Sequence, residues 1–214
     1  MTLRKLSRVL PLIIFACVIS MVAQTAKAQS NDETASQATK DRTNLDTQLY
    51  LLVGSNQAND SARLPTVLEP VVKQLRSTLQ FKNYRLAATL INRVRNGGRL
   101  SLRWIGEPLA MGTTSPNIPS FSEFKVSAIR LVTDQRGQQA VQMEGFSFGA
   151  RIPIQTSGPM ASNSQVPPVF NYENTGLNTD ISMREGEPVV VGTLNIGSSG
   201  DAIILVVSAK RTLQ

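Results

Sequence analysis

Histidine is absent from the 214-residue sequence, and cysteine occurs once, at position 17. Without histidine the chain lacks the commonest metal ligand, the commonest general base near neutral pH and the base of a Ser-His-Asp triad. A phosphate-binding loop is also missing, because the Gly-Ser-Ser-Gly segment at 197–200 is not followed by the lysine of a P-loop. We therefore predict that the protein is not an enzyme and that it binds no metal and no cofactor.

The N-terminal segment has the three parts of a removable signal peptide, which we predict to be residues 1–28. Arg4, Lys5 and Arg8 form a basic start, residues 9–23 are almost entirely apolar, and the Ala-Lys-Ala segment at 26–28 places small residues where signal peptidase reads. As a helix, the apolar run would cover about 22 Å of a hydrocarbon layer about 30 Å thick. The pattern predicts export.

Two other fates of this segment remain open. A retained membrane anchor is disfavoured because Ser20 and Gln24 end the apolar run early. Lipidation of Cys17 is disfavoured because Phe15 is bulky where a small residue is expected, and a long apolar stretch would follow the cleavage point. Removal of the leader takes away the only cysteine and four basic residues, so that the formal net charge falls from +7 to +3.

Composition divides the remaining chain into a linker and one domain. Residues 29–46 are rich in small polar side chains and contain Leu45 as the only large apolar one, which predicts a flexible linker. Residues 47–214 are enough for a single β-rich domain with its own core. Within it we expect a β-α-β-β unit at 47–105 and a further β region at 106–214.

Periodicity predicts the elements of the first unit. An apolar run at 48–53 indicates a strand, and apolar residues spaced by three and four from Leu64 to Leu79 indicate a helix, with Thr66 as its N-cap and Pro70 in its first turn. Alternation at 86–94 then indicates a half-buried strand. The Asn-Gly-Gly turn at 96–98 favours a tight hairpin, whose return strand continues to Trp104.

Further strands follow in the second region. Residues 124–133 and 138–144 flank a turn at 134–137, and residues 188–191 and 202–207 read as paired strands. Residues 156–168 are loaded with Ser, Pro and Asn and predict an exposed loop. The last strand is nearly all apolar, which is typical of a central strand that is buried on both faces. The predicted fold class is α+β, mostly antiparallel β, as a β-sandwich or sheet.

The stretch from Pro70 to Gly106 contains eight basic residues and no acid. Alternation places four of them on the outer side of the predicted hairpin: Arg93, Arg95, Arg99 and Arg103. Such a stripe is a candidate site for an anionic lipid or polymer, and export makes nucleic acid a poor candidate. The alternative is a solvated face that blunts an exposed strand edge.

Residues 149–211 resemble the C-terminal part of the secretin family, the outer-membrane ring proteins of type II and III secretion and type IV pili. The similar segments are Ala-Arg-Ile-Pro-Ile at 150–154, Tyr-Glu-Asn-Thr-Gly-Leu at 172–177, Gly-Glu-Pro-Val-Val-Val-Gly at 186–192 and the closing strand at 203–211. The long membrane-facing region and the repeated periplasmic domains of secretins have no counterpart here. The resemblance implies a secretin-like β module in a Gram-negative-type envelope.

Two functional hypotheses follow. The first is a non-enzymatic exported protein of the periplasm or outer membrane, a structural or interaction component of a secretion or pilus-type assembly. Its partners would be envelope or secretion-system proteins and further copies of itself. The second is a secreted or periplasmic binding module that captures an anionic partner through the basic hairpin.

Overall fold

The computed structural model describes residues 43–56, 64–106, 109, 118–133, 137–157, 169–196 and 200–212. The predicted signal peptide, Cys17, nearly all of the predicted linker and most of the predicted loop at 156–168 lie outside these residues. Within the described ranges, no helix is long and apolar enough to cross a membrane.

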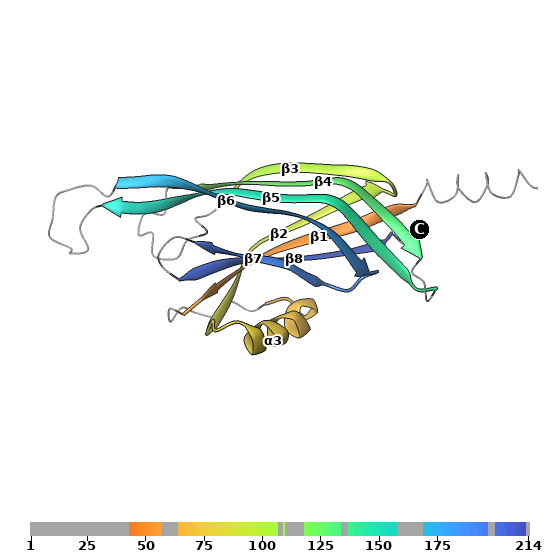
Figure 1. The fold of residues 1–214 in the computed structure, drawn as a ribbon, viewed down its shortest axis with the longest axis horizontal. Helices are drawn as coiled ribbons and strands as arrows, with labels where there is room; N and C mark the ends of the chain where they lie inside the picture. The colour runs from red at the N-terminus through yellow and green to blue at the C-terminus, as the bar shows by residue number, and fades with distance from the viewer. Residues whose placement is uncertain are drawn as a thin grey trace, which may run out of the picture. The chain divides into compact units, whose positions relative to one another are not determined.

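In the described ranges the chain forms two four-stranded antiparallel sheets, which confirms the mostly β fold class (Figure 1). Sheet A has the strand order β2-β1-β8-β7, and sheet B the order β3-β4-β5-β6. The bounds of the strands are β1 Asn44–Ser55, β2 Asn83–Arg95, β3 Gly98–Gly106, β4 Ser120–Thr133, β5 Gln139–Ser157, β6 Val169–Arg184, β7 Val189–Ile196 and β8 Asp201–Arg211. β1 thus begins inside the segment that composition assigned to the linker.

The main core lies between the two sheets. Side chains alternate along each strand, so one face of every strand points into this space. Sheet B contributes Phe124, Phe146 and Phe148, which are at most 1% exposed, and sheet A contributes leucines such as Leu49 and Leu205. The apolar positions of the period-two patterns therefore meet across the sandwich.

β8 confirms the prediction of a central strand. It lies between β1 and β7, and residues 201–209 are all buried. Leu205 and Val207 join the core between the sheets, whereas Ile204 and Val206 join a second cluster on the opposite face. The sequence of this strand is apolar at nearly every position because both of its faces are covered.

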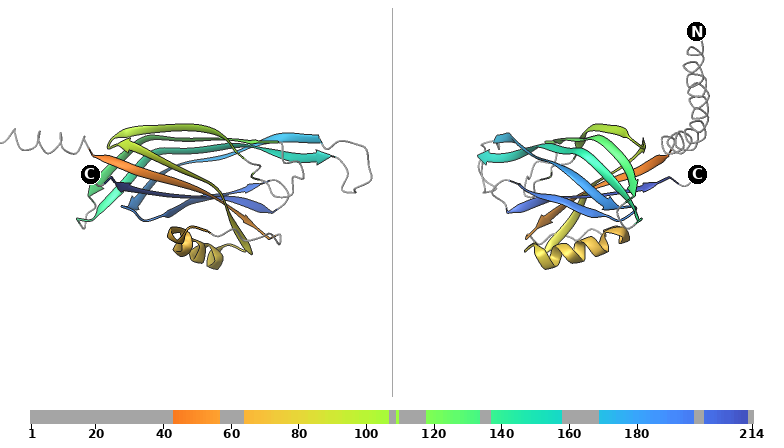
Figure 2. Two further views of the ribbon diagram at one scale, coloured as in Figure 1. Left: turned by 180° about the vertical axis from the view of Figure 1, so that it is seen from behind. Right: turned by 45° about the vertical axis from the view of Figure 1, so that its right-hand side comes forward.

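A helix covers the outer face of sheet A, as the two views in Figure 2 show. It consists of the 3-10 turn η2 (Thr66–Leu68) followed by the helix α3 (Glu69–Thr78). The second cluster is formed by buried residues of η2, α3 and sheet A: Leu68, Val71, Val72, Leu75, Tyr50, Leu52, Tyr84, Ile204 and Val206. The amphipathic spacing of the helix therefore matches its burial.

The start of the helix differs in part from the prediction. Thr66 does not cap it, because Thr66 is the first residue of η2 and no side-chain cap hydrogen bond forms there. The spacing of three and four from Leu64 also places Val67 on the apolar face, but Val67 is 45% exposed because it lies in the tighter 3-10 turn. Pro70 lies in the first turn of α3, as expected.

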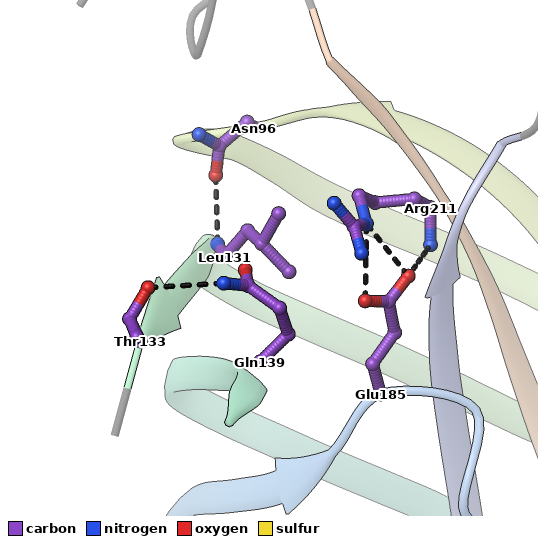
Figure 3. A network of polar contacts seen from close by, with 6 residues as sticks. All are labelled: Asn96, Leu131, Thr133, Gln139, Glu185 and Arg211. Atoms are coloured by element: carbon purple, nitrogen blue, oxygen red, sulfur yellow. Dashed lines mark hydrogen bonds and ion pairs between the residues drawn. The ribbon is translucent and has the colours of Figure 1, made fainter. Parts of the chain in front are cut away.

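The predicted hairpin between β2 and β3 is wrong, although both strands and the turn exist. β2 pairs with β1 in sheet A, and β3 pairs with β4 in sheet B. The turn residues bond to residues in or next to neighbouring strands: Asn96 N donates to Thr43 O at 2.8 Å, and Gly97 N donates to Ile129 O at 2.7 Å. Leu131 N donates to Asn96 Oδ1 at 2.8 Å (Figure 3). The turn is therefore a corner at which the chain changes sheets.

The other predicted hairpins are confirmed. β4 pairs with β5, which follows it after residues 134–138, and β7 pairs with β8, which follows it after residues 197–200. β5 also pairs with β6, so the segments at 150–154 and 172–177 that resemble secretins lie side by side.

An ion pair joins the two sheets near the C-terminal end of β8 (Figure 3). Glu185, just after β6, accepts hydrogen bonds from the backbone N of Arg211 at 2.8 Å and from its Nε at 3.0 Å. Burial raises the pKa of Glu185, but the side-chain and backbone hydrogen bonds and the charge of Arg211 outweigh it and lower the pKa. The end of sheet B is thereby tied to sheet A.

Candidate interaction site

The four arginines of the predicted anionic site are all exposed, but they belong to two surfaces. Arg93 and Arg95 lie on the outer face of β2 in sheet A, opposite to the inward Val94. Arg99 and Arg103 lie on the outer face of β3 in sheet B, opposite to the inward Leu100 and Leu102. Because the outer faces of two stacked sheets point away from each other, the four guanidinium groups do not form the single row that a hairpin would give.

Two of these arginines are paired with acids. Arg93 Nε lies 2.7 Å from Asp46 Oδ1 on β1, and Arg103 Nε lies 2.6 Å from Glu123 Oε1 on β4. Glu123 also contacts Lys125 Nζ at 2.7 Å. The hydrogen bond from Lys125 and then that from Arg103 lower the pKa of Glu123. The charge that these two arginines could offer to an anionic partner is thus partly neutralised within the chain.

The pair between Arg93 and Asp46 leads to a test by titration. The hydrogen bond from Arg93 is the largest cause of the lowered pKa of Asp46. Because this pKa lies below its unfolded value, the stabilisation is present at neutral pH and is lost as the pH falls through the folded pKa. We expect Arg93→Gln to raise the pKa of Asp46, measured by NMR titration of its carboxyl carbon. Arg95→Gln is the control and should leave that pKa unchanged; equal titration of Asp46 in all three proteins would contradict the pairing.

A groove of about 390 Å³ crosses the outer face of sheet B. The strand register aligns its residues in two rows that run across all four strands. One row is Arg103, Glu123 and Gly149, followed on β6 by Gly176, which does not line the groove, and the adjacent row is Ile105, Phe121, Arg151 and Asn174. Gly149 leaves its part of the sheet without a side chain and forms the floor of the groove.

Aromatic and aliphatic side chains border this groove. Ile105 is 67% exposed and Phe121 is 39% exposed, although both are large apolar residues in a regular sheet. Tyr172 of β6 packs beside Phe121, with the ring centroids 5.7 Å apart, and donates a hydrogen bond from its hydroxyl to Pro119 O at 3.0 Å. Arg151 stacks on Tyr172, with Cζ 5.5 Å from the ring centroid. Among the described residues, Arg151 has no carboxylate partner.

Sequence reasoning missed this groove. Each contributor stands alone in the sequence, and pairing of four strands brings them together. The only local signal is that Phe121 and Ile105 occupy the outward positions of alternating strands, where polar residues are usual. Among the described residues, no group of three or more Asp, Glu, His or Cys side chains could hold a metal ion.

Both edges of sheet B are open in the described part of the chain. β3 pairs only with β4, and β6 pairs only with β5, so each edge presents a row of unpaired backbone groups. β6 spans 16 residues and carries Glu173, Asp180 and Arg184, whereas β3 carries Arg99, Arg103 and no acid. The formal charge is therefore −1 on β6 and +2 on β3.

Comparison with known proteins finds no matching family model and no matching curated protein. Among solved structures, the chain is similar to the type II secretion system secretin GspD of E. coli K12, with 12% identity over 96% of this chain and 61% of that chain and a TM-score of 0.38. The secretin InvG of the Salmonella SPI-1 type III secretion injectisome shares 10% identity over 85% of this chain and 68% of that chain, with a TM-score of 0.35.

A chain of the Klebsiella pneumoniae type II secretion system outer membrane complex, which contains PulD, PulS and PulC, gives 11% identity over 86% of this chain, 43% of that chain and a TM-score of 0.38. These matches confirm a partial resemblance to secretins. The matched part extends beyond residues 149–211, because it covers 85% of this chain or more in all three cases.

Proposed function

We propose that the protein is a non-enzymatic, exported component of an envelope assembly of the secretion or pilus type. Its role would be to join with further copies of itself through the two open edges of sheet B. The observation that carries the proposal is the arrangement of this sheet, in which four strands alternate in direction and both edges are unpaired among the described residues. The segments that resemble secretins lie in β5, β6, β7 and β8 and agree with it.

The direction of the strands makes head-to-tail association possible. An antiparallel sheet with an even number of strands has edge strands that run in opposite directions. When β6 of one copy meets β3 of the next, the new pair is again antiparallel, and the pattern repeats without a break. Such a contact joins two different surfaces, so it generates a ring if the rotation closes.

The charges on the edges favour this contact over self-pairing of one edge. Asp180 on β6 lies on the same outer face as Arg99 and Arg103 on β3, so a contact between β6 and β3 can bring unlike charges together, whereas two β3 edges would bring arginines together. Sheet A is less suited to such growth. Its edge strand β7 has only eight residues and a bulge after Val190.

Thiol cross-linking tests the contact directly. In a Cys17→Ser background, the double variant Ser101→Cys and Asn178→Cys places one thiol on each edge of sheet B, since both positions are exposed on its outer face. Within one copy the two edges are separated by three strand spacings, about 14 Å, and a cross-link formed there would leave the protein at the size of one copy. We expect a short bismaleimide to produce a ladder of covalent dimers, trimers and larger species on a denaturing gel.

The single variants are the matched controls. Either one alone can join at most two copies, so the ladder should stop at the dimer. Sedimentation of the uncross-linked protein should show assemblies that dissociate in high salt. A protein that sediments as a monomer at every concentration and gives no ladder in the double variant would contradict the proposal.

The capture of an anionic partner by Arg93, Arg95, Arg99 and Arg103 is the second candidate function. Arg95 and Arg99 favour it, because they are exposed and have no acidic partner among the described residues. They flank the corner between the sheets, with Arg95 on the outer face of sheet A and Arg99 on that of sheet B, so an anionic partner would have to follow the corner to contact both. Loss of salt-sensitive binding to anionic vesicles in the double variant Arg95→Gln and Arg99→Gln tests this candidate, with Arg130→Gln as the control.

A further inference from the structure

The groove on sheet B has an apolar border and an excess of positive charge. Ile105, Phe121 and Tyr172 supply exposed apolar surface. Arg103 and Lys125 share the single acid Glu123, and Arg151 adds a further cation that no described carboxylate neutralises. The groove therefore offers an apolar surface together with a guanidinium that can bind an anionic ligand through charge-assisted hydrogen bonds.

The size and shape of the groove suit an elongated small molecule. Its volume of about 390 Å³ lies within the range of ligand sites in proteins. It crosses four strands, which corresponds to a length of about 14 Å. The floor at Gly149 is open, because a Cβ atom built there meets no other atom within 4 Å. An extended chain can therefore lie across the strands over the glycine and contact Ile105 and Phe121 on the way.

We propose that this groove binds an amphiphile that has an aliphatic chain and a carboxylate headgroup. Arg151 binds the carboxylate, and Tyr172 holds the guanidinium in place by stacking under it. The chain lies across Gly149 beside Phe121 and Ile105. The net positive charge of the groove selects a carboxylate over a cationic or neutral headgroup. The site lies within one copy of the chain, so it does not depend on the proposed assembly.

Binding is measured by calorimetry with saturated fatty acids of eight, ten and twelve carbons, each below its micelle concentration. We expect saturable binding with one molecule per chain, and an affinity that rises about two- to fourfold for each added methylene group. Acetate and dodecyltrimethylammonium should not bind, because the first lacks the chain and the second has the wrong charge. Equal binding of the cationic amphiphile, or no saturable binding of dodecanoate, would overturn the proposal.

Two variants locate the site. Arg151→Gln should weaken the binding of dodecanoate about tenfold or more, because it removes a charge-assisted hydrogen bond. Gly149→Leu should abolish the binding by filling the groove, and its circular dichroism and unfolding midpoint should remain close to those of the parent. Arg99→Gln is the matched control, since Arg99 lies on the same face of sheet B but does not line the groove.

Other occupants would give different results. A short peptide with a C-terminal leucine that binds more tightly than dodecanoate, and whose binding is lost in Gly149→Leu, would replace the amphiphile by a polypeptide. If dodecanoate does not bind and Gly149→Leu converts assemblies into monomers, the groove is instead a contact between copies. Unchanged binding of dodecanoate in both groove variants would place the ligand elsewhere.

Discussion

Replacement of Phe146 by alanine is expected to cost about 3–5 kcal/mol of the free energy of unfolding. Phe146 is fully buried between the sheets, and its ring centroid lies 5.1 Å from that of Phe124. Truncation removes a large apolar side chain and leaves a cavity that two rigid sheets cannot close. The loss is a large part of the 5–15 kcal/mol that typically stabilises a domain.

The measurement is chemical and thermal unfolding followed by circular dichroism. The midpoint of thermal unfolding should fall by about 10 °C for a domain of this size. Phe121→Ala is the matched control, because Phe121 lies on the same sheet but on its outer face, and it should cost about 1 kcal/mol or less. Similar losses for the two variants would contradict a core formed between the sheets.

Replacement of Gly176 by alanine is expected to destabilise the protein by about 1–3 kcal/mol, although the change adds one methyl group to an exposed residue. A Cβ atom at this position would lie 2.5 Å from the carbonyl oxygen of Phe148 and 3.3 Å from the Cα of Gly149. Both are backbone atoms of β5, so no side chain can rotate away. β6 must therefore move away from β5.

The directly paired residue provides the control. Gly149 lies opposite Gly176 in the register of β5 and β6, yet a Cβ at Gly149 meets nothing within 4 Å. We expect Gly149→Ala to change stability by about 0.5 kcal/mol or less. Amide hydrogen exchange should show faster opening of β6 only in Gly176→Ala. Equal protection of β6 in both variants would show that the close approach at Gly176 does not limit the pairing.

The displacement of β6 from β5 in Gly176→Ala should affect the proposed assembly as well as the stability of the fold. β6 is the edge through which a copy would meet the next one, so Gly176→Ala should weaken association as well as folding. Gly149→Ala should leave both unchanged. An assembly that survives in Gly176→Ala at full strength would argue that copies meet through another surface.

Several features could be read from local sequence because local physics determines them. The apolar run in β8 predicted a central strand, and the strand is buried on both faces. Gly97 and Gly137 predicted turns, and both adopt positive φ. The spacing of Val71, Val72 and Leu75 predicted the buried face of α3. In each case a residue and its near neighbours carry the information.

The corner at Asn96 shows where such reading fails. An Asn-Gly turn between two alternating strands is the usual signal of a hairpin. Here the backbone of Asn96 and Gly97 bonds to Thr43 and Ile129, which belong to distant parts of the sequence. An Asn-Gly turn fits a hairpin and a corner between two sheets equally well. The hydrogen bonds to residues remote in sequence therefore determine that the chain forms a corner.

The candidate sites depend on the same distinction. The sequence by itself determined the amino-acid types, the alternation along each strand and the basic character of residues 70–106. Only the tertiary structure decided that Arg93 and Arg103 lie on opposite outer faces, and that Phe121 and Arg151 line one groove with Tyr172 packed against both. The alternation of apolar and polar residues along a strand indicates on which face of that strand a side chain lies. Which strands become neighbours depends on pairing between distant segments, and local periodicity carries no record of it.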